Sequence, residues 1–470
     1  MRTHSAIRWT DALKDTGRSE HDLLSLESPL PQLDLYPAST QSLSSRDEAI
    51  FLLHIAAEIE HSLMVQYLYA MFSFGPLSEL SSPQSDWVKS IRNIAKQEMG
   101  HLITVQNLAL TLGGPITFER EDYPFRSDFY PFPMTLERPT RDVFAKYVVA
   151  EMPPLESITS LPTKHLVKEA MVRSEAANGG VAVNRVGALY SKLKYVVANI
   201  PEAEFAFATA DTYQAAPLEI GQTSGPGGAH PMDSIMCWPI TSKKIALDAL
   251  DLIASQGEGP LHAASTSHFA QFLSIYQAFP ESNPIFGVVA PNPCRPVPTN
   301  PRFSNGHFDL NAITAPIAVQ LAQFGNLRYR LVLDGLSHYL LLNRKDRPNC
   351  KAYLATFATY EMANTITPVA THLTSLKRQV PDVFIGGLPA VAGMPFHMPY
   401  SLSLSPNESS RWRGHIGILR HSDLLAQQLV SDKQCPHDLR TVLKAIVSQD
   451  QDSLTQMNSA AEHSDMDCSD

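Results

Sequence analysis

The most regular feature of the chain is a pair of segments, residues 45–74 and 86–112, in which apolar side chains recur every three or four positions. That spacing is the period of one face of an α-helix. The first segment opens with Ser-Arg-Asp-Glu, a capping box in which Ser45 is the N-cap and Glu48 follows three residues later. The pattern predicts two long helices that are joined by about ten residues and pack antiparallel.

Downstream of these two helices, helical segments alternate with stretches rich in proline and glycine. Residues 116–140 contain many prolines and aromatic residues and predict an irregular, packed excursion. Residues 281–312 predict loops, and residues 377–415 predict loops or short strands. Apolar periodicity returns in six further segments, which predict helices over 141–150, 164–177, 186–200, 242–256, 313–342 and 351–376.

The two ends of the chain differ from its middle. Residues 1–44 show no sustained period, whereas residues 448–470 are polar and acidic, a composition typical of disorder. We therefore predict four parts, which are an extended lead-in over 1–44, a helical bundle over 45–280, a helical extension packed on it over 281–430, and a disordered tail over 448–470.

A glutamate and a histidine lie in the apolar stripe of the second predicted helix. Glu98 and His101 are three residues apart and therefore share a helix face, where their neighbours are Ile94, Leu102 and Val105. A carboxylate in such a stripe is costly to bury unless it is paired or binds a metal. Glu-x-x-His on an inward face is the local unit of two-metal carboxylate centres in four-helix bundles. The alternative is a polar pair at a partly solvated helix edge.

The first predicted helix supplies a second inward carboxylate. Glu60 shares the densest apolar stripe with Leu63, whereas Glu58 lies on a more polar side and is interpreted as a solvated surface charge. Tyr67 lies two turns beyond Glu60 on the same stripe, where it can hydrogen-bond a buried site. Two adjacent helices that each bury a carboxylate favour a shared site over a chance pairing.

These two helices resemble a known family. AAEIEHSLMVQYLYAMFS and IRNIAKQEMGHLITVQNLALTLGG are similar to the opening helix hairpin of the ferritin-like domain of iminophenyl-pyruvate dimer synthases, which couple amino-acid-derived imines in violacein and indolocarbazole biosynthesis. QGEG and SHF, at 256–259 and 267–269, resemble later motifs of that family, as do VGALYSKL and AGMPFHM. The resemblance implies an all-α fold, namely a ferritin-like four-helix bundle with long Pro/Gly-rich insertions and additional C-terminal helices.

The resemblance also implies a metal site. Carried over residue by residue, its ligands are Glu60, Glu98, His101, Glu258 and His268. Two positions depart from the family pattern, because Ala188 and Ser255 stand where it has glutamates. The remaining nitrogen and oxygen donors suit non-haem iron, mononuclear or di-iron, with another divalent metal as the alternative. Glu98, His101 and Tyr67 are the implied catalytic residues.

Three further residues could replace the missing ligands. His262 follows Glu258 by four positions, and Glu169 and Glu175 lie in the predicted helix over 164–177. We interpret His262 as a loop residue and the two glutamates as members of a polar segment.

Composition narrows the classes of partner. The 470-residue chain has a net charge of −10 and no basic stripe, which argues against nucleic-acid binding. It has no apolar run of about 20 residues and hence no predicted membrane span, and its start lacks the apolar core of a secretory signal. Five scattered cysteines without a Cys-x-x-Cys pair fit a reducing compartment. We predict a cytoplasmic protein that binds a small-molecule substrate, and its assembly into a homo-oligomer stays open.

Together these features favour a non-haem iron- or other metal-dependent enzyme of secondary metabolism. It would oxidise, oxidatively couple or rearrange a small organic substrate, with the aromatic residues of 116–133 forming part of the pocket wall. One alternative is a metal-free cyclase or isomerase that uses Glu98 and His101 as acid and base. Another is a ferritin-like scaffold without catalysis.

Overall fold

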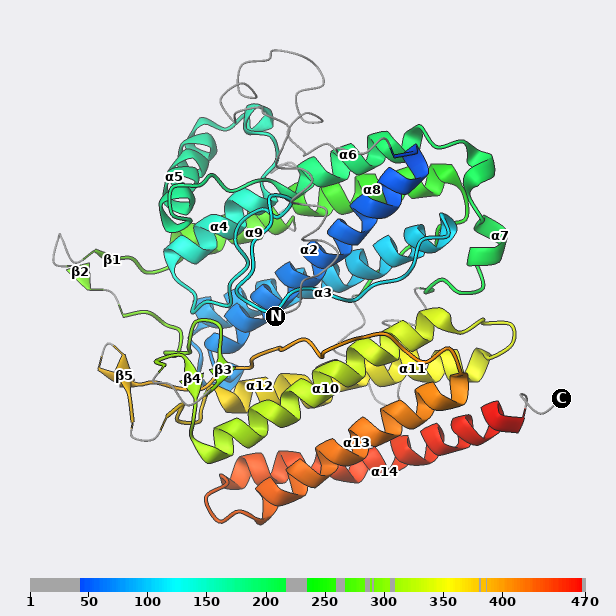
Figure 1. Cartoon of the computed structure of the whole chain (residues 1–470). Coiled ribbons are helices and arrows are strands. Elements are labelled where there is room, and N and C mark those ends of the chain that lie inside the picture. Colours follow the sequence, from blue (N-terminus) through cyan, green and yellow to red (C-terminus); the bar gives the residue numbers. More distant parts are fainter. Residues whose placement is uncertain are drawn as a thin grey trace.

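The computed structural model of the chain is built almost entirely from helices (Figure 1). It describes residues 43–216, 235–258, 267–283, 288–289, 291–304, 309–379, 382–385 and 387–466. The α-helices of this part are α2 (Ser45–Ser73), α3 (Ser82–Thr111), α4 (Arg141–Glu151), α5 (Leu161–Ala177), α6 (Val186–Ala198), α7 (Phe207–Ala210), α8 (Lys243–Glu258), α9 (His268–Ala278), α10 (Pro316–Leu341), α11 (Pro348–Tyr360), α12 (Thr367–Leu373), α13 (Glu408–Ser431) and α14 (His437–Met466).

Within the described residues, the strands form three two-residue pairings, and there are two isolated bridges, Phe125 with Met134 and Lys377 with Val391. β1 (Ser282–Asn283) and β2 (Val288–Val289) are antiparallel, as are β5 (Phe384–Ile385) and β6 (Leu388–Pro389), whereas β3 (Arg302–Phe303) and β4 (Ala312–Ile313) are parallel. The short helical turns are Leu77–Glu79, Leu155–Ser157 and Glu202–Glu204.

The predicted pair of long helices is present as the α2–α3 hairpin, with shifted starts. Ser44, not Ser45, caps α2, because its side chain accepts a hydrogen bond from the Asp47 backbone N–H at 3.1 Å. The second helix begins four residues earlier than predicted, since Gln84 accepts a hydrogen bond from the Ser81 backbone N–H at 3.1 Å and completes an earlier cap.

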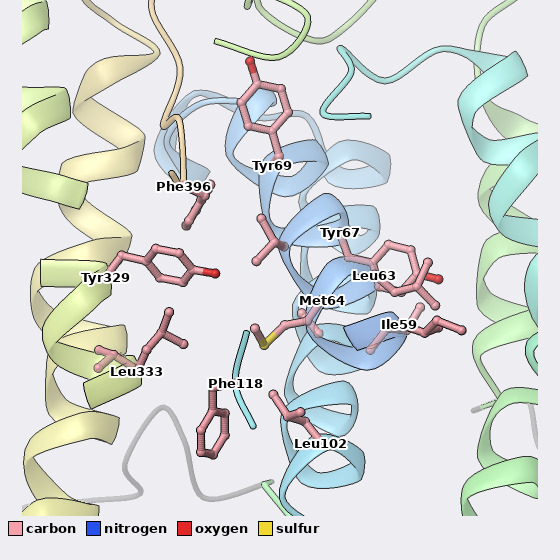
Figure 2. Close-up of a cluster of buried hydrophobic side chains, with 14 of the residues drawn as sticks. Ile59, Leu63, Met64, Tyr67, Tyr69, Leu102, Phe118, Tyr329, Leu333 and Phe396 are labelled. Carbon is pink, nitrogen blue, oxygen red and sulfur yellow. The ribbon is translucent and has the colours of Figure 1, made fainter. Parts of the chain in front are cut away.

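The hairpin is buried on two opposite sides, which is why α2 is apolar nearly all round. In Figure 1 the helices α4 to α9 lie along one side of the hairpin, and α10 to α14 lie along the other. Neighbouring residues therefore face different layers: Leu63 points toward the first layer and Met64 toward α10 (Figure 2).

The first layer completes a four-helix bundle in an interrupted form. The hairpin helices have 29 and 30 residues, whereas α4, α6, α8 and α9 have only 11, 13, 16 and 11. α4 pairs with α9 and α6 pairs with α8, so two shorter pairs together run along the hairpin (Figure 1). Pro153 and Pro154 follow α4 after a single residue, Met152, and prevent its continuation. The ends of all four short helices meet in the middle of the bundle.

A buried ion cluster ties the second layer together. The guanidinium of Arg328 in α10 is fully buried and lies 3.3 Å from a Glu361 carboxylate oxygen, 3.1 Å from Asp423 in α13 and 3.0 Å from Asp450 in α14. Glu361 opens a π-helix, Glu361–Ile366, between α11 and α12. Because a buried charge that loses its partner is strongly destabilising, this cluster fixes α13 and α14 against α10.

The C-terminal prediction was wrong in one respect. Residues 448–466 belong to α14, whose apolar face packs on α13, so the predicted disordered tail is helical over this range. Its polar and acidic composition reflects a helix with one solvated side. Residues 467–470 and the predicted lead-in up to residue 42 lie outside the described residues. No helix within the described part is long and apolar enough to cross a membrane.

Candidate metal centre

The centre of the bundle, where the short helices are interrupted, contains a cluster of buried carboxylates and histidines. Glu60 comes from α2, Glu98 and His101 from α3, Glu151 from the last turn of α4, and His268 from the first turn of α9. All five residues are at most 3% exposed. A carboxylate at a helix C-terminus and a cationic imidazole at a helix N-terminus are both unfavourable placements for the helix dipole. Because both placements are costly for the helices, they favour a role for these side chains in binding.

Glu98 connects two triads of potential ligands. Its Oε2 lies 2.9 Å from Nδ1 of His101, and its Oε1 lies 3.1 Å from Nδ1 of His268. Glu60 joins the first triad and Glu151 joins the second, and within each triad the ligand atoms lie within 4.8 Å of one another. A carboxylate that offers one oxygen to each of two groups has the arrangement of a bridging ligand.

The two outer glutamates are each held by a tyrosine. The Tyr190 hydroxyl, from α6, donates to Oε1 of Glu60, and the Tyr67 hydroxyl donates to Oε1 of Glu151 at 2.5 Å. The other oxygen of each glutamate points toward a histidine, at 3.4 Å in both cases. The tyrosines thus fix the carboxylates so that one oxygen of each faces the centre.

The two histidines are oriented by glutamines. Nε2 of His101 lies 2.7 Å from Oε1 of Gln256, and Nε2 of His268 lies 2.8 Å from Oε1 of Gln97. An amide oxygen only accepts hydrogen bonds, so Nε2 carries the proton in both rings. Both Nδ1 atoms therefore face the carboxylates, which is the ligand orientation that a hydrogen bond to the remote nitrogen enforces in metal sites.

Burial and mutual contact shift the pKa values of these groups in opposite directions. Burial, reinforced by the Glu98 charge, raises the pKa of Glu60 to about 8. Burial also opposes ionisation of Glu98, but the charge of His268 and hydrogen bonds from its neighbours outweigh it and hold its pKa well below the usual value. Burial disfavours the charged histidines, yet contact with the glutamates raises the pKa of His101 well above normal and that of His268 to about 9. Without a metal, Glu60 and the two histidines therefore hold protons that a bound metal ion would displace.

The donor set fits one or two divalent cations. Oε2 of Glu60 and Nδ1 of His268 are buried and make no hydrogen bond of acceptable geometry, although both have polar neighbours within 3.4 Å. Glu60 and His268 line a space of about 20 Å³, which admits a water-sized species. Three carboxylates and two imidazoles are hard and borderline ligands that suit iron or manganese better than copper.

The structure brings together four of the five predicted ligands, namely Glu60, Glu98, His101 and His268. The fifth, Glu258, is the last residue of α8, and its side chain lies outside the described residues. Tyr67 hydrogen-bonds the buried centre, as its position on the helix predicted, and its partner there is Glu151.

Sequence reasoning missed Glu151. The third-helix glutamate was sought at Ala188, but the interruption of the bundle places that residue on α6, and the carboxylate comes instead from the end of α4. Its signal in the sequence is a glutamate that ends the apolar helix FAKYVVAE one residue before the pair Pro153-Pro154. Ser255 is exposed and donates to a backbone carbonyl. Glu169 is bound to Arg141, and Glu175 is exposed.

Two interpretations of neighbouring residues were wrong. Glu58 is not a solvated charge, because it is partly buried and accepts a hydrogen bond from the Tyr130 hydroxyl, and burial raises its pKa to about 7. The residues of 116–133 do not line the centre. Several of them line a separate cavity of about 410 Å³ beside Glu58.

Comparisons with known proteins agree with this geometry. The family model described as Ferritin-like matches residues 53–277, slightly under half of the chain, and this range holds every residue of the centre. The prediction of an all-α, ferritin-like fold is thereby confirmed. No curated protein matches the chain.

A solved structure described as a ferritin-like protein from Caulobacter vibrioides is similar over 69% of this chain and 94% of that chain, at 15% identity. Its TM-score of 0.37 is too low for it to carry weight. The finer resemblance to iminophenyl-pyruvate dimer synthases stays a prediction.

Proposed function

We propose that this protein is a metal-dependent oxidoreductase whose two-metal, non-haem centre is bound by Glu60, Glu98, His101, Glu151 and His268. The observation that supports this most is the position of Glu98, which offers one oxygen to each of two Glu/His triads. Iron is the preferred metal and manganese the alternative, because the donors are carboxylates and imidazoles. The chemistry that iron supplies at such a centre is the activation of dioxygen.

The chain's own residues supply orientation and protection. Tyr67 and Tyr190 hold the outer carboxylates, and Gln97 and Gln256 set the histidine tautomers. Burial of all ligands excludes bulk water, which strengthens every electrostatic interaction within the site. Among the described residues, the space at the centre is water-sized, about 20 Å³.

We further propose that the substrate belongs to secondary metabolism and that the reaction is an oxidation or oxidative coupling. The support is the resemblance of the α2–α3 hairpin and of the QGEG and SHF motifs to enzymes that couple amino-acid-derived imines. A cytoplasmic location fits the scattered cysteines.

Metal-free acid/base catalysis is less well supported. Such a mechanism would need His101 or Glu98 to exchange protons near neutral pH. The pKa of His101 is held well above its usual range and that of Glu98 well below it, so the pair stays charged. A scaffold without catalysis does not explain why two buried ligand atoms, Glu60 Oε2 and His268 Nδ1, make no hydrogen bond.

The test is elemental analysis of the protein expressed in iron-supplemented medium, followed by measurement of dioxygen consumption before and after chelation. Bound iron and chelator-sensitive consumption support the proposal. Protein that binds no transition metal, even after anaerobic reconstitution with iron or manganese, would contradict it.

A further inference from the structure

Another cavity lies on the side of the hairpin away from the metal centre, between the hairpin and the layer that contains α10. It has a volume of about 240 Å³ and is lined by residues of α2, α3, α10 and the π-helix, among them Met64, Met99, Leu333 and Met362. Figure 2 shows Met64 pointing toward Leu333 and Tyr329 across this space. None of its lining residues lines the metal centre. We call it the inter-layer cavity.

The walls of the inter-layer cavity are apolar and adaptable. Met64, Met71, Met99 and Met362 all line it, and methionine side chains adjust to irregular ligands because they are unbranched and polarisable. A dry apolar cavity of about 150 Å³ is already large enough to take up benzene. This cavity therefore has room for an apolar body of larger size.

Unusual backbone geometry is concentrated at the same walls. The π-helix Glu361–Ile366 contributes Met362, Ala363 and Ile366 to the lining, and π-helical segments occur mostly as single turns at functional sites. Phe396 also lines the cavity and has a φ of +50°, in the left-handed region. Such strained geometry in a bulky residue persists only where the surrounding structure holds it in place, and it is concentrated at active sites and ligand clamps.

One edge of the inter-layer cavity is cationic. Arg92 and Lys96 line it from successive turns of α3, an i,i+4 spacing at which two like charges repel. No residue in the described part of the chain forms an ion pair or hydrogen bond with the partly buried Arg92 side chain, and burial lowers its pKa. A half-buried guanidinium that lies beside an apolar cavity and has no partner among the described residues is a receptor for an anionic group.

We propose that the inter-layer cavity binds a small amphipathic carboxylate, with its apolar body between α2, α3 and α10 and its acid group at Arg92. This goes beyond the proposed oxidation, because the α2–α3 hairpin separates the ligand from Glu98 and His101. The bound molecule is thus not the species that reacts at the metal centre, and its binding does not depend on the metal.

The experiment is calorimetric titration of the full-length protein with octanoate and, as an uncharged match, with 1-octanol. Octanoate is expected to bind saturably, with one molecule per chain. Arg92→Gln should weaken the affinity for octanoate about 10- to 100-fold, because one charge-assisted contact is lost. The affinity for 1-octanol should not change. Lys89→Gln removes an exposed cation from the same helix and should change neither the octanoate affinity nor the octanol affinity.

A variant that fills the inter-layer cavity tests whether the apolar body of the ligand binds there. Ala363→Phe fills the inter-layer cavity and should abolish binding of both probes, with circular dichroism verifying its helical content. Absence of saturable octanoate binding to the wild-type protein would overturn the proposal, as would equal octanoate affinity in Arg92→Gln. Metal content measured on the same samples is expected to stay constant, so failure here is distinguishable from failure of the metal assignment.

Discussion

Oε1 of Glu98 lies 3.1 Å from Nδ1 of His268, so residues from α3 and α9 meet at the interruption of the bundle. The other oxygen of Glu98 is already in contact with His101. This double contact makes one glutamate common to both halves of the centre, and the predictions below follow from it and from its surroundings.

Glu151 is expected to be a ligand of equal importance, although it lies outside the carried-over motifs. Glu151→Gln should keep the volume and the Tyr67 contact but lose the charge that faces His268, so the chain should bind one metal ion fewer. Glu175→Gln on α5 is the matched control, because Glu175 is exposed. Mass spectrometry of the purified proteins measures the number of metal ions bound per chain. An unchanged number in Glu151→Gln would show that Glu151 is not a ligand.

Gln97 is expected to act through His268. Gln97→Leu removes the acceptor that fixes the Nε2 proton, and loss of such an orienting contact typically lowers metal affinity 10- to 100-fold. Asn93→Leu changes an exposed position of the same helix and should leave affinity unaltered. Competition with a coloured chelator reports the affinity. Equal values for the two variants would show that the glutamine plays no orienting role.

The stability of the metal-free protein should fall as the pH rises from about 6.5 to 9. The pKa of Glu60 is raised from 4.5 to about 8 and that of His268 from 6.5 to about 9. A group with a raised folded-state pKa stabilises the fold below its unfolded pKa, and this stabilisation is lost as the pH passes the folded value. Thermal unfolding of wild type and Glu60→Gln over this range measures the effect, and the variant should show a shallower decline.

Metal should reverse that trend. Binding displaces the protons from Glu60, His101 and His268, so metal affinity and the metal-induced rise in Tm should grow with pH. If the metal-induced rise in Tm becomes smaller between pH 6.5 and pH 9, these groups do not bind the ion.

Gly100 is expected to be intolerant of any side chain. It lies between Glu98 and His101 on α3, and a Cβ at this position would overlap the backbone carbonyl oxygen of Met236. Gly100→Ala should therefore cost about 1–3 kcal/mol in the free energy of unfolding. Gly414→Ala on α13 meets open space and should stabilise the protein by roughly 0.5–1 kcal/mol. Denaturant titration distinguishes them, and equal stabilities would contradict the close approach.

Much of the hairpin and of its chemistry could be predicted from sequence. Helical period placed Glu60, Glu98 and His101 on inward faces, and the structure brings these side chains together. Periodicity could not reveal Glu151, because it is the last residue of a short helix whose partner across the interruption, α6, lies far along the chain. Local patterns describe one helix at a time, whereas this centre is assembled from the ends of several.

The C-terminal layer was predicted less well for a related reason. The polar residues of 448–466 indicate disorder when read alone, but α14 is stabilised by tertiary contacts such as that of Asp450 with Arg328. The inter-layer cavity could not be predicted from the sequence either, since it depends on the distance between layers and on a π-helix that has no sequence signature.

The most direct test of the two-metal assignment is an anaerobic titration with Fe(II) that counts the ions bound per chain. Wild type and Glu58→Gln, a variant of a partly buried glutamate outside the centre, should each bind two ions, one for each triad. Glu98→Gln should bind neither firmly, because both triads lose their common carboxylate. Two ions retained by Glu98→Gln, or none bound by the wild-type protein, would contradict the assignment.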